Sequence, residues 1–225
     1  MWEVRGPSFL SVQDLPVALR KGTIVDLETT GLEPAKSAIV CLGCVFGSTL
    51  EIHMRGRSAR PDEFYNQLRS VLRSRPQPFY AYNSKFDGSL MKRYLGYKGP
   101  GLVDLFEPWR SRAESRNMKF PSLDELVRGP WDALPPYRVP VEDDELPLGV
   151  LSEDEELWLR RGRHSWRRRA WQFKGLVAGK DVPRLWREYL RGNDYAIRQI
   201  AEHNREDLLK SLCLVSFLGG SPLTE

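Results

Sequence analysis

Apolar residues recur along this chain with two kinds of spacing, and each spacing predicts one kind of secondary-structure element. Short apolar runs bounded by turn residues predict strands, which we place at residues 23–28, 38–46, 50–54, 78–82 and 102–105. Apolar residues three and four apart predict helices, which we place at residues 12–20, 61–73, 84–94, 121–127, 182–190 and 193–218. Gly47 and Ser48 are typical of a hairpin turn, so the early strands should form an antiparallel meander.

Residues that favour helix starts support several of these helices. Pro61 suits a first helical turn, Ser122 with Glu125 matches a capping box, and Asn193 is a good N-cap. A strand meander followed by strand–helix–strand units predicts an α/β fold, with a mixed antiparallel and parallel sheet flanked by helices. We expect a single domain over residues 1–225 with an irregular insertion at about 129–174.

That insertion has a composition of its own. Residues 129–151 contain five prolines and the acidic run EDDE, which predicts an extended excursion over the surface. Residues 160–171, RRGRHSWRRRAW, interleave six arginines with two tryptophans. Arg167 and Arg168 are therefore candidate phosphate contacts, with the tryptophans stacking on unpaired bases. The alternative is a helix whose arginines pair with upstream acids while its tryptophans are buried.

The net charge, the absence of long apolar runs and the cysteine spacing indicate which classes of protein the sequence favours. The formal net charge is +4 and the pI about 9.0, which favours a polyanionic partner such as nucleic acid. No apolar run of about 18 residues predicts a membrane span, and the first residues lack the pattern of a signal peptide. Cys41 and Cys44 lie in an apolar run without a second Cys/His pair, which indicates core packing over zinc binding. We expect a cytoplasmic protein.

The strand at 23–28 ends in two carboxylates. Asp26 and Glu28 are two residues apart, so their side chains leave the same face of the strand. Burying both is costly unless a cation pairs with them, and hard divalent cations prefer such oxygen ligands. Thr29 and Thr30 follow with hydroxyls that suit a phosphate. The less specific interpretation is a strand that ends in a polar turn.

Two later segments supply further acids. Asn83 and Asp87 belong to an N-x-x-F-D sequence at a strand-to-helix junction, where an acid also suits the helix dipole. His203 and Asp207 are four residues apart, so they share one face of the last predicted helix. Such a His–Asp pair alone is more often structural than catalytic.

Together, DLETTGL, NSKFD and HNRED resemble the three motifs of the DEDD (DnaQ-like) exonucleases, which have the ribonuclease H-like fold. The third motif combines the spacing of the family's tyrosine branch with the residue of its histidine branch. HNREDLL and VPRLWREYL are also similar to the predicted ribonuclease H-like exonuclease family typified by YprB. The resemblance covers residues 23–105 and 175–218.

The resemblance implies a metal-dependent 3′–5′ exonuclease acting on DNA or RNA. Asp26, Glu28 and Asp87 would share two Mg²⁺ or Mn²⁺ ions, Asp207 would bind one of them, and His203 would orient or deprotonate water. Substrate contacts would come from Thr29, Thr30 and Asn83. Two alternatives remain open: a structure-selective endonuclease with the same site, and a nucleic-acid-binding module without catalysis.

Overall fold

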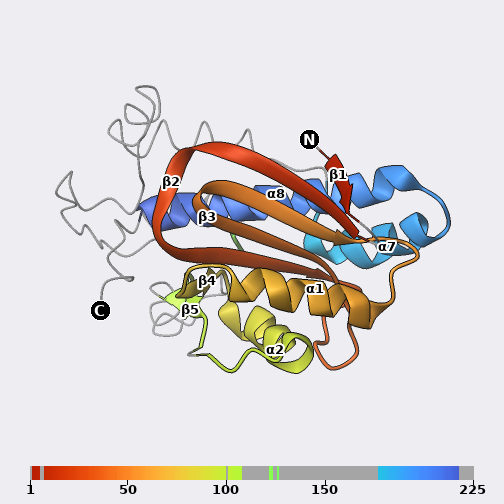
Figure 1. Cartoon of the computed structure of the whole chain (residues 1–225), viewed down its shortest axis with the longest axis horizontal. Coiled ribbons are helices and arrows are strands. Elements are labelled where there is room, and N and C mark those ends of the chain that lie inside the picture. Colours follow the sequence, from red (N-terminus) through yellow and green to blue (C-terminus); the bar gives the residue numbers. More distant parts are fainter. Residues whose placement is uncertain are drawn as a thin grey trace.

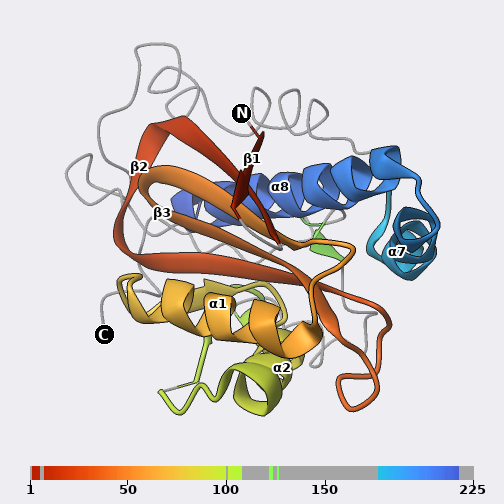
Figure 2. The ribbon, with the colours of Figure 1, turned by 45° about the vertical axis from the view of Figure 1, so that its right-hand side comes forward.

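A mixed five-stranded sheet with helices on both faces forms the body of the molecule (Figures 1 and 2). The structure is a computed structural model that describes residues 2–5, 8–99, 101–107, 122–123, 126 and 177–217. The predicted mixed α/β fold is confirmed. The predicted insertion at about 129–174 and its arginines lie outside the described residues.

Strand β2 (Ser8–Thr29) is the central strand of the sheet. One of its edges pairs antiparallel with β3 (Ile39–Arg55) along most of its length. Its other edge pairs antiparallel with β1 (Trp2–Arg5) near the start and parallel with β4 (Phe79–Ala81) near residues 23–24. Strand β5 (Val103–Asp104) extends the parallel part beyond β4.

Two local predictions were wrong in this part of the chain. Residues 12–20, predicted as a helix, belong to β2, because residues 8–14 pair with 49–55 of β3 and residues 8–11 pair with β1. The sequence between 39 and 55 is one strand without a hairpin at Gly47. Gly47 uses its positive φ of 51° where the β2–β3 register shifts, and residues 30–38 form the connection between these strands.

The helices begin and end close to the predicted positions. They are α1 (Pro61–Arg73), α2 (Ser84–Leu95), α7 (Val182–Leu190) and α8 (Asp194–Phe217). A short 3₁₀ helix, η4 (Gly179–Asp181), leads into α7. Asn193 accepts a hydrogen bond from the Tyr195 N–H at 3.1 Å, as predicted for an N-cap. None of the described helices has the length and apolar character needed to cross a bilayer.

Alternate residues of the central strands divide between two hydrophobic cores. Ile24 belongs to a cluster under α7 and α8, whereas Val25 belongs to a cluster under α1 and α2. Cys41 and Cys44 lie in opposite clusters, both fully buried and unbridged, which confirms their role in core packing. Because side chains alternate along a strand, the positions two and four residues after Ile24 must also face α8.

Candidate active site

The positions that face α8 beyond Ile24 are Asp26 and Glu28. Asp26 lies opposite Gly43 and Glu28 opposite Cys41 in the pairing of β2 with β3. Burial raises the pKa of both carboxyls well above the usual values, and the neighbouring acids raise it further. Both acids are thus close together in a site where negative charge is poorly compensated.

Helix α8 approaches this part of the sheet very closely. The amide of Asn204 donates hydrogen bonds to the Asp26 side chain at 2.6 Å and to its backbone carbonyl at 3.2 Å. A Cβ atom on Gly43 would lie 2.0 Å from Asn204 Oδ1 and 2.5 Å from a methyl of Leu208. Gly43 is therefore the residue that allows α8 to bring its side chains to the acids of β2.

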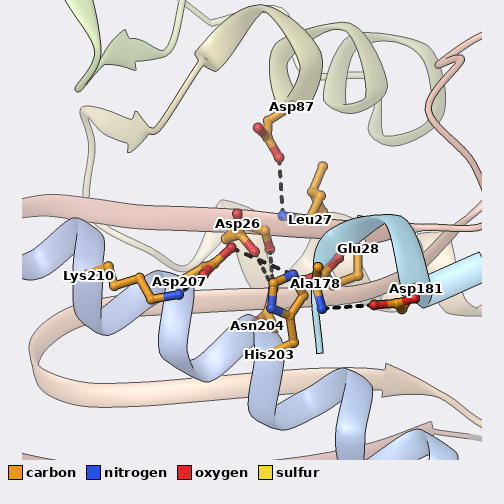
Figure 3. Close-up of polar contacts among 10 residues, drawn as sticks. All are labelled: Asp26, Leu27, Glu28, Asp87, Ala178, Asp181, His203, Asn204, Asp207 and Lys210. Carbon is orange, nitrogen blue, oxygen red and sulfur yellow. Dashed lines mark hydrogen bonds and ion pairs between the residues drawn. The ribbon is translucent and has the colours of Figure 1, made fainter. Parts of the chain in front are cut away.

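One turn of α8 places His203 and Asp207 beside Glu28 (Figure 3). His203 Nε2 lies 3.6 Å from Glu28 Oε1 and 3.7 Å from Asp207 Oδ2, so it faces both carboxylates. The predicted shared helical face is confirmed. A Cβ atom on Gly179 would lie 3.4 Å from His203 Nε2, which shows that η4 packs against the imidazole from the other side.

Asp87 reaches the same stretch of β2 from the opposite face of the sheet (Figure 3). It lies in the first turn of α2, after Asn83 in the left-handed region with φ 55°. Its Oδ1 accepts a hydrogen bond from the Leu27 N–H at 3.1 Å, between the two acids of β2. Burial raises the pKa of Asp87 to about 7, although that hydrogen bond lowers it.

A buried lysine completes the cluster. Lys210 is only 3 % exposed, and its Nζ lies 2.7 Å from Asp207 Oδ1. Its charge opposes the rise in the pKa of Asp26 and Glu28. Lys210 and Asn204 were not predicted from the sequence, although both lie within one helical turn of His203 or Asp207. A lysine three residues after an acid on a helix was the available signal.

The acids open onto a pocket of about 160 Å³. Its polar lining includes Asp26, Glu28, Thr29, His203 and Asp207, and its apolar lining includes Leu32, Phe86 and Pro183. Thr29 Oγ1 donates to the Gly31 carbonyl at 2.5 Å.

Of the four other candidate substrate contacts, only Thr30 and Asn83 belong to the described residues. Thr30 and Asn83 are not among the residues that line the pocket. The Thr30 hydroxyl accepts from the Ala38 N–H at 3.0 Å, so it closes the turn between β2 and β3. Arg167 and Arg168 lie outside the described residues.

The donor set fits a hard divalent cation, because it consists of buried carboxylate oxygens in excess over positive charge. Asp26, Glu28, Asp87 and Asp207 are the residues that would hold such an ion. Within the described ranges, however, no three His, Cys, Asp or Glu side chains are grouped closely enough to hold one. The contacts explain this, since Asp87 is bonded to the Leu27 N–H and Asp207 to Lys210.

A comparison with protein-family models agrees with this architecture. A family model described as the RNase_H superfamily matches residues 23–133. A solved structure described as "apo form of the nuclease" aligns with 91 % of this chain and 84 % of its own, at 13 % identity and a TM-score of 0.36. A search of the curated proteins found no match. The mixed sheet and the family-model match over residues 23–133 indicate a ribonuclease H-like α/β fold.

Proposed function

We propose that the protein is a divalent-metal-dependent nuclease, and that it acts as a 3′–5′ exonuclease on DNA or RNA. The observation that carries the proposal is the meeting of β2 and α8. Asp26 and Glu28 face the same pocket as His203 and Asp207, although the two segments are about 180 residues apart. A purely structural role gives no reason to gather one buried and two half-buried carboxylates, Glu28, Asp26 and Asp207, at an open pocket.

The acids would act as ligands. Asp26, Glu28 and Asp87 would share a pair of Mg²⁺ or Mn²⁺ ions, and Asp207 would contribute to one of them. The bound ions would supply Lewis-acid activation of the phosphodiester and compensate the charge of the transition state. Asp87 is not among the residues that line the pocket, so it would have to give up its hydrogen bond with the Leu27 N–H and turn toward Asp26 for this role.

His203 would act as the general base that accepts the proton of the attacking water. Its Nε2 faces the pocket, and a neutral imidazole accepts a proton near neutral pH. Water oxygen would bond to phosphorus as the bond to the 3′ oxygen breaks, which releases a terminal nucleotide with a 5′ phosphate. Glu28 and Asp207 on either side of the imidazole would stabilise the imidazolium that results.

The pocket's apolar wall would position the terminal nucleotide. Phe86 and Leu32 offer faces for a base or sugar, and Leu32 is 75 % exposed at the rim. Thr29 lines the same pocket, so it remains the best placed of the threonine contacts proposed for the substrate. Thr30, Asn83, Arg167 and Arg168 stay as further proposed contacts of lower priority.

End-labelled oligonucleotides test the proposal. Single- and double-stranded DNA and RNA with a 5′ label, incubated with Mn²⁺, should give ladders that shorten one nucleotide at a time from the 3′ end. Asp26→Asn should reduce the rate at least about a hundredfold with the fold unchanged. The exposed acid Asp62 on α1 provides a matched control, because Asp62→Asn should keep the full rate.

Each of the other possible results of this assay would lead to a different conclusion about the function. Internal cuts would replace the exonuclease with a structure-selective endonuclease. Binding of nucleic acid without cleavage would indicate a non-catalytic module. Cleavage by Asp26→Asn at the wild-type rate would refute the site.

A further inference from the structure

Helix α7 carries a row of positively charged residues on its exposed side. Its other side is apolar and packs against α8 and the sheet, with Val182, Leu185, Trp186 and Tyr189 buried. The basic residues recur at intervals of four, three and four along η4 and α7, which places them on one side of a helix. All four are exposed, and we call them the basic row: Lys180, Arg184, Arg187 and Arg191.

The acidic residues of the same segment offset only part of this charge. Asp181 Oδ2 accepts a hydrogen bond from the Ala178 N–H at 3.2 Å, at the start of η4. Glu188 forms an ion pair with Arg184 at 2.6 Å, one helical turn away. One member of the basic row is therefore compensated by an acid of its own helix.

The other three members have no such acid. Within the described ranges, no ion pair involves Lys180, Arg187 or Arg191. Arg187 donates from Nε to the Pro183 carbonyl at 3.2 Å, a contact that leaves its charge uncompensated. Three exposed positive charges on one side of a helix thus form a surface that favours an anionic partner.

The basic row begins at the rim of the pocket. Gly179 and Pro183 line the pocket together with the acids of β2 and α8, and Lys180 lies between them in the sequence. The far end of α7 lies at the edge of the molecule, beside the start of α8 (Figures 1 and 2). That start precedes His203 by nine residues, or about 13 Å along α8. The basic row therefore leads away from the pocket.

We propose that the basic row binds the sugar–phosphate backbone of the nucleic acid strand whose 3′ end occupies the pocket. The inference rests on the proposed function, because it assumes a nucleic acid substrate. Arginine and lysine side chains neutralise phosphates without reading bases. The acids of the pocket repel the same phosphates, so the basic row supplies attraction that the pocket lacks. Its length of about 16 Å matches four to five nucleotides of one strand, at roughly 3.4 Å per phosphate.

Oligonucleotide binding in EDTA tests the inference while no cleavage takes place. Fluorescently labelled single-stranded DNA and RNA of about ten nucleotides are titrated with the full chain at several salt concentrations. The triple variant Lys180→Gln, Arg187→Gln and Arg191→Gln should bind at least about tenfold more weakly at low salt. The slope of log K against log salt should fall by about 2, because each lost phosphate contact removes about 0.7.

A control variant with the same loss of charge separates position from net charge. Arg73→Gln, Lys92→Gln and Arg93→Gln together also remove two arginines and one lysine, all exposed. These residues belong to α1 and α2, which cover the other face of the sheet. The control variant should keep the salt slope of wild type and bind within a factor of about two.

Cleavage kinetics separate the basic row from the reacting centre. With Mn²⁺ and the same oligonucleotides, the triple variant should raise KM at least about fivefold and leave kcat unchanged. A dinucleotide is too short to extend along α7, so wild type and the triple variant should cleave it at equal rates. Circular dichroism checks that the variants are folded. If the triple variant does not fold, Lys180→Gln and Arg191→Gln are measured singly, and each should lower the salt slope by about 0.7.

The outcomes distinguish this inference from the proposed function. Cleavage by wild type, with unchanged affinity and salt slope in the triple variant, would overturn the inference and leave the nuclease proposal standing. Weaker binding by the triple variant, with no cleavage even by wild type, would support the basic row and reject the nuclease. Tighter binding of an acidic peptide than of either oligonucleotide through these residues would assign the basic row to a protein partner and overturn the inference.

Discussion

Asn204 Nδ2 donates hydrogen bonds to both the side chain and the backbone of Asp26, at 2.6 Å from Oδ2 and 3.2 Å from the carbonyl oxygen. This double contact joins segments 178 residues apart and fixes the carboxylate against α8. Since Asn204 is fully buried, no water replaces its donor when it is removed.

We therefore expect Asn204→Ala to destabilise the protein by about 1–3 kcal/mol, the cost of leaving a buried acceptor unpaired. Nuclease activity should also fall, because Asp26 loses its orientation. Denaturant unfolding measures the first effect and oligonucleotide cleavage the second. Asn66→Ala, at an exposed position of α1, should change neither quantity appreciably. Equal stability of Asn204→Ala and wild type would mean that the contact contributes nothing.

Gly43 should tolerate no side chain. A Cβ atom would lie 2.0 Å from Asn204 Oδ1, so Gly43→Ala must push α8 away from the sheet or force Asn204 aside. We expect a loss of about 1–3 kcal/mol in unfolding free energy together with a large loss of cleavage activity. Gly101→Ala is the matched control, because nothing lies within 4 Å of its Cβ position. A fully active, fully stable Gly43→Ala would contradict the close approach of α8.

The metal-free protein should lose stability as pH rises. Burial raises the pKa of Asp87 to about 7 and raises that of Asp26 and Glu28 well above normal, so the folded state holds protons that the unfolded state releases. A raised carboxyl pKa favours folding at low pH, and that contribution disappears between about pH 4 and 7 for Asp87. The melting temperature in EDTA should therefore be higher at pH 5.5 than at pH 8.

Asp87→Asn isolates one contributor to this slope. Asparagine is neutral at every pH and can still accept from the Leu27 N–H, so it resembles protonated Asp87. The variant should melt higher than wild type at pH 8, and by a smaller margin at pH 5.5, when both are measured in EDTA. A lower melting temperature at pH 8 would show that the charged carboxylate stabilises the fold.

His203 should matter for the rate and for its pH dependence. If its imidazole accepts the proton from water, His203→Ala and His203→Gln should both reduce kcat by about a hundredfold or more, with little change in KM. Both variants should also lose the acidic limb of the wild-type pH profile. Substantial activity in His203→Gln with an unaltered pH profile would mean that the residue orients water, and full activity in His203→Ala would leave it a packing role against η4.

Features of this site that belong to a single strand or helix could be predicted from the sequence, whereas contacts between distant segments could not. The spacing of Asp26 and Glu28 after an apolar run placed both on one strand face, and the spacing of His203 and Asp207 placed both on one helix face. Those are properties of a single element, and a local pattern determines them. The hydrogen bond of Asn204 to Asp26 and the clearance at Gly43 depend on how α8 crosses the sheet, which no local pattern specifies.

The failed prediction at residues 12–20 has the same physical origin. Leu15 and Leu19 are four residues apart, as on one helical face, and both are indeed buried. They are buried in a strand because residues 8–14 find backbone partners in β1 and in the far half of β3. Hydrogen bonds to two neighbouring strands thus override a weak helical spacing.

The division of the site between β2 and α8 also determines the order in which its residues are made during protein synthesis. A growing polypeptide makes Asp26 and Glu28 early, whereas Asn204, Asp207 and Lys210 follow about 180 residues later. While α8 is still unmade, the acids of β2 have neither the amide that orients them nor the ammonium that offsets their charge. Under the proposed function, an unfinished chain on the ribosome would therefore hold an incomplete site until α8 has docked on the sheet.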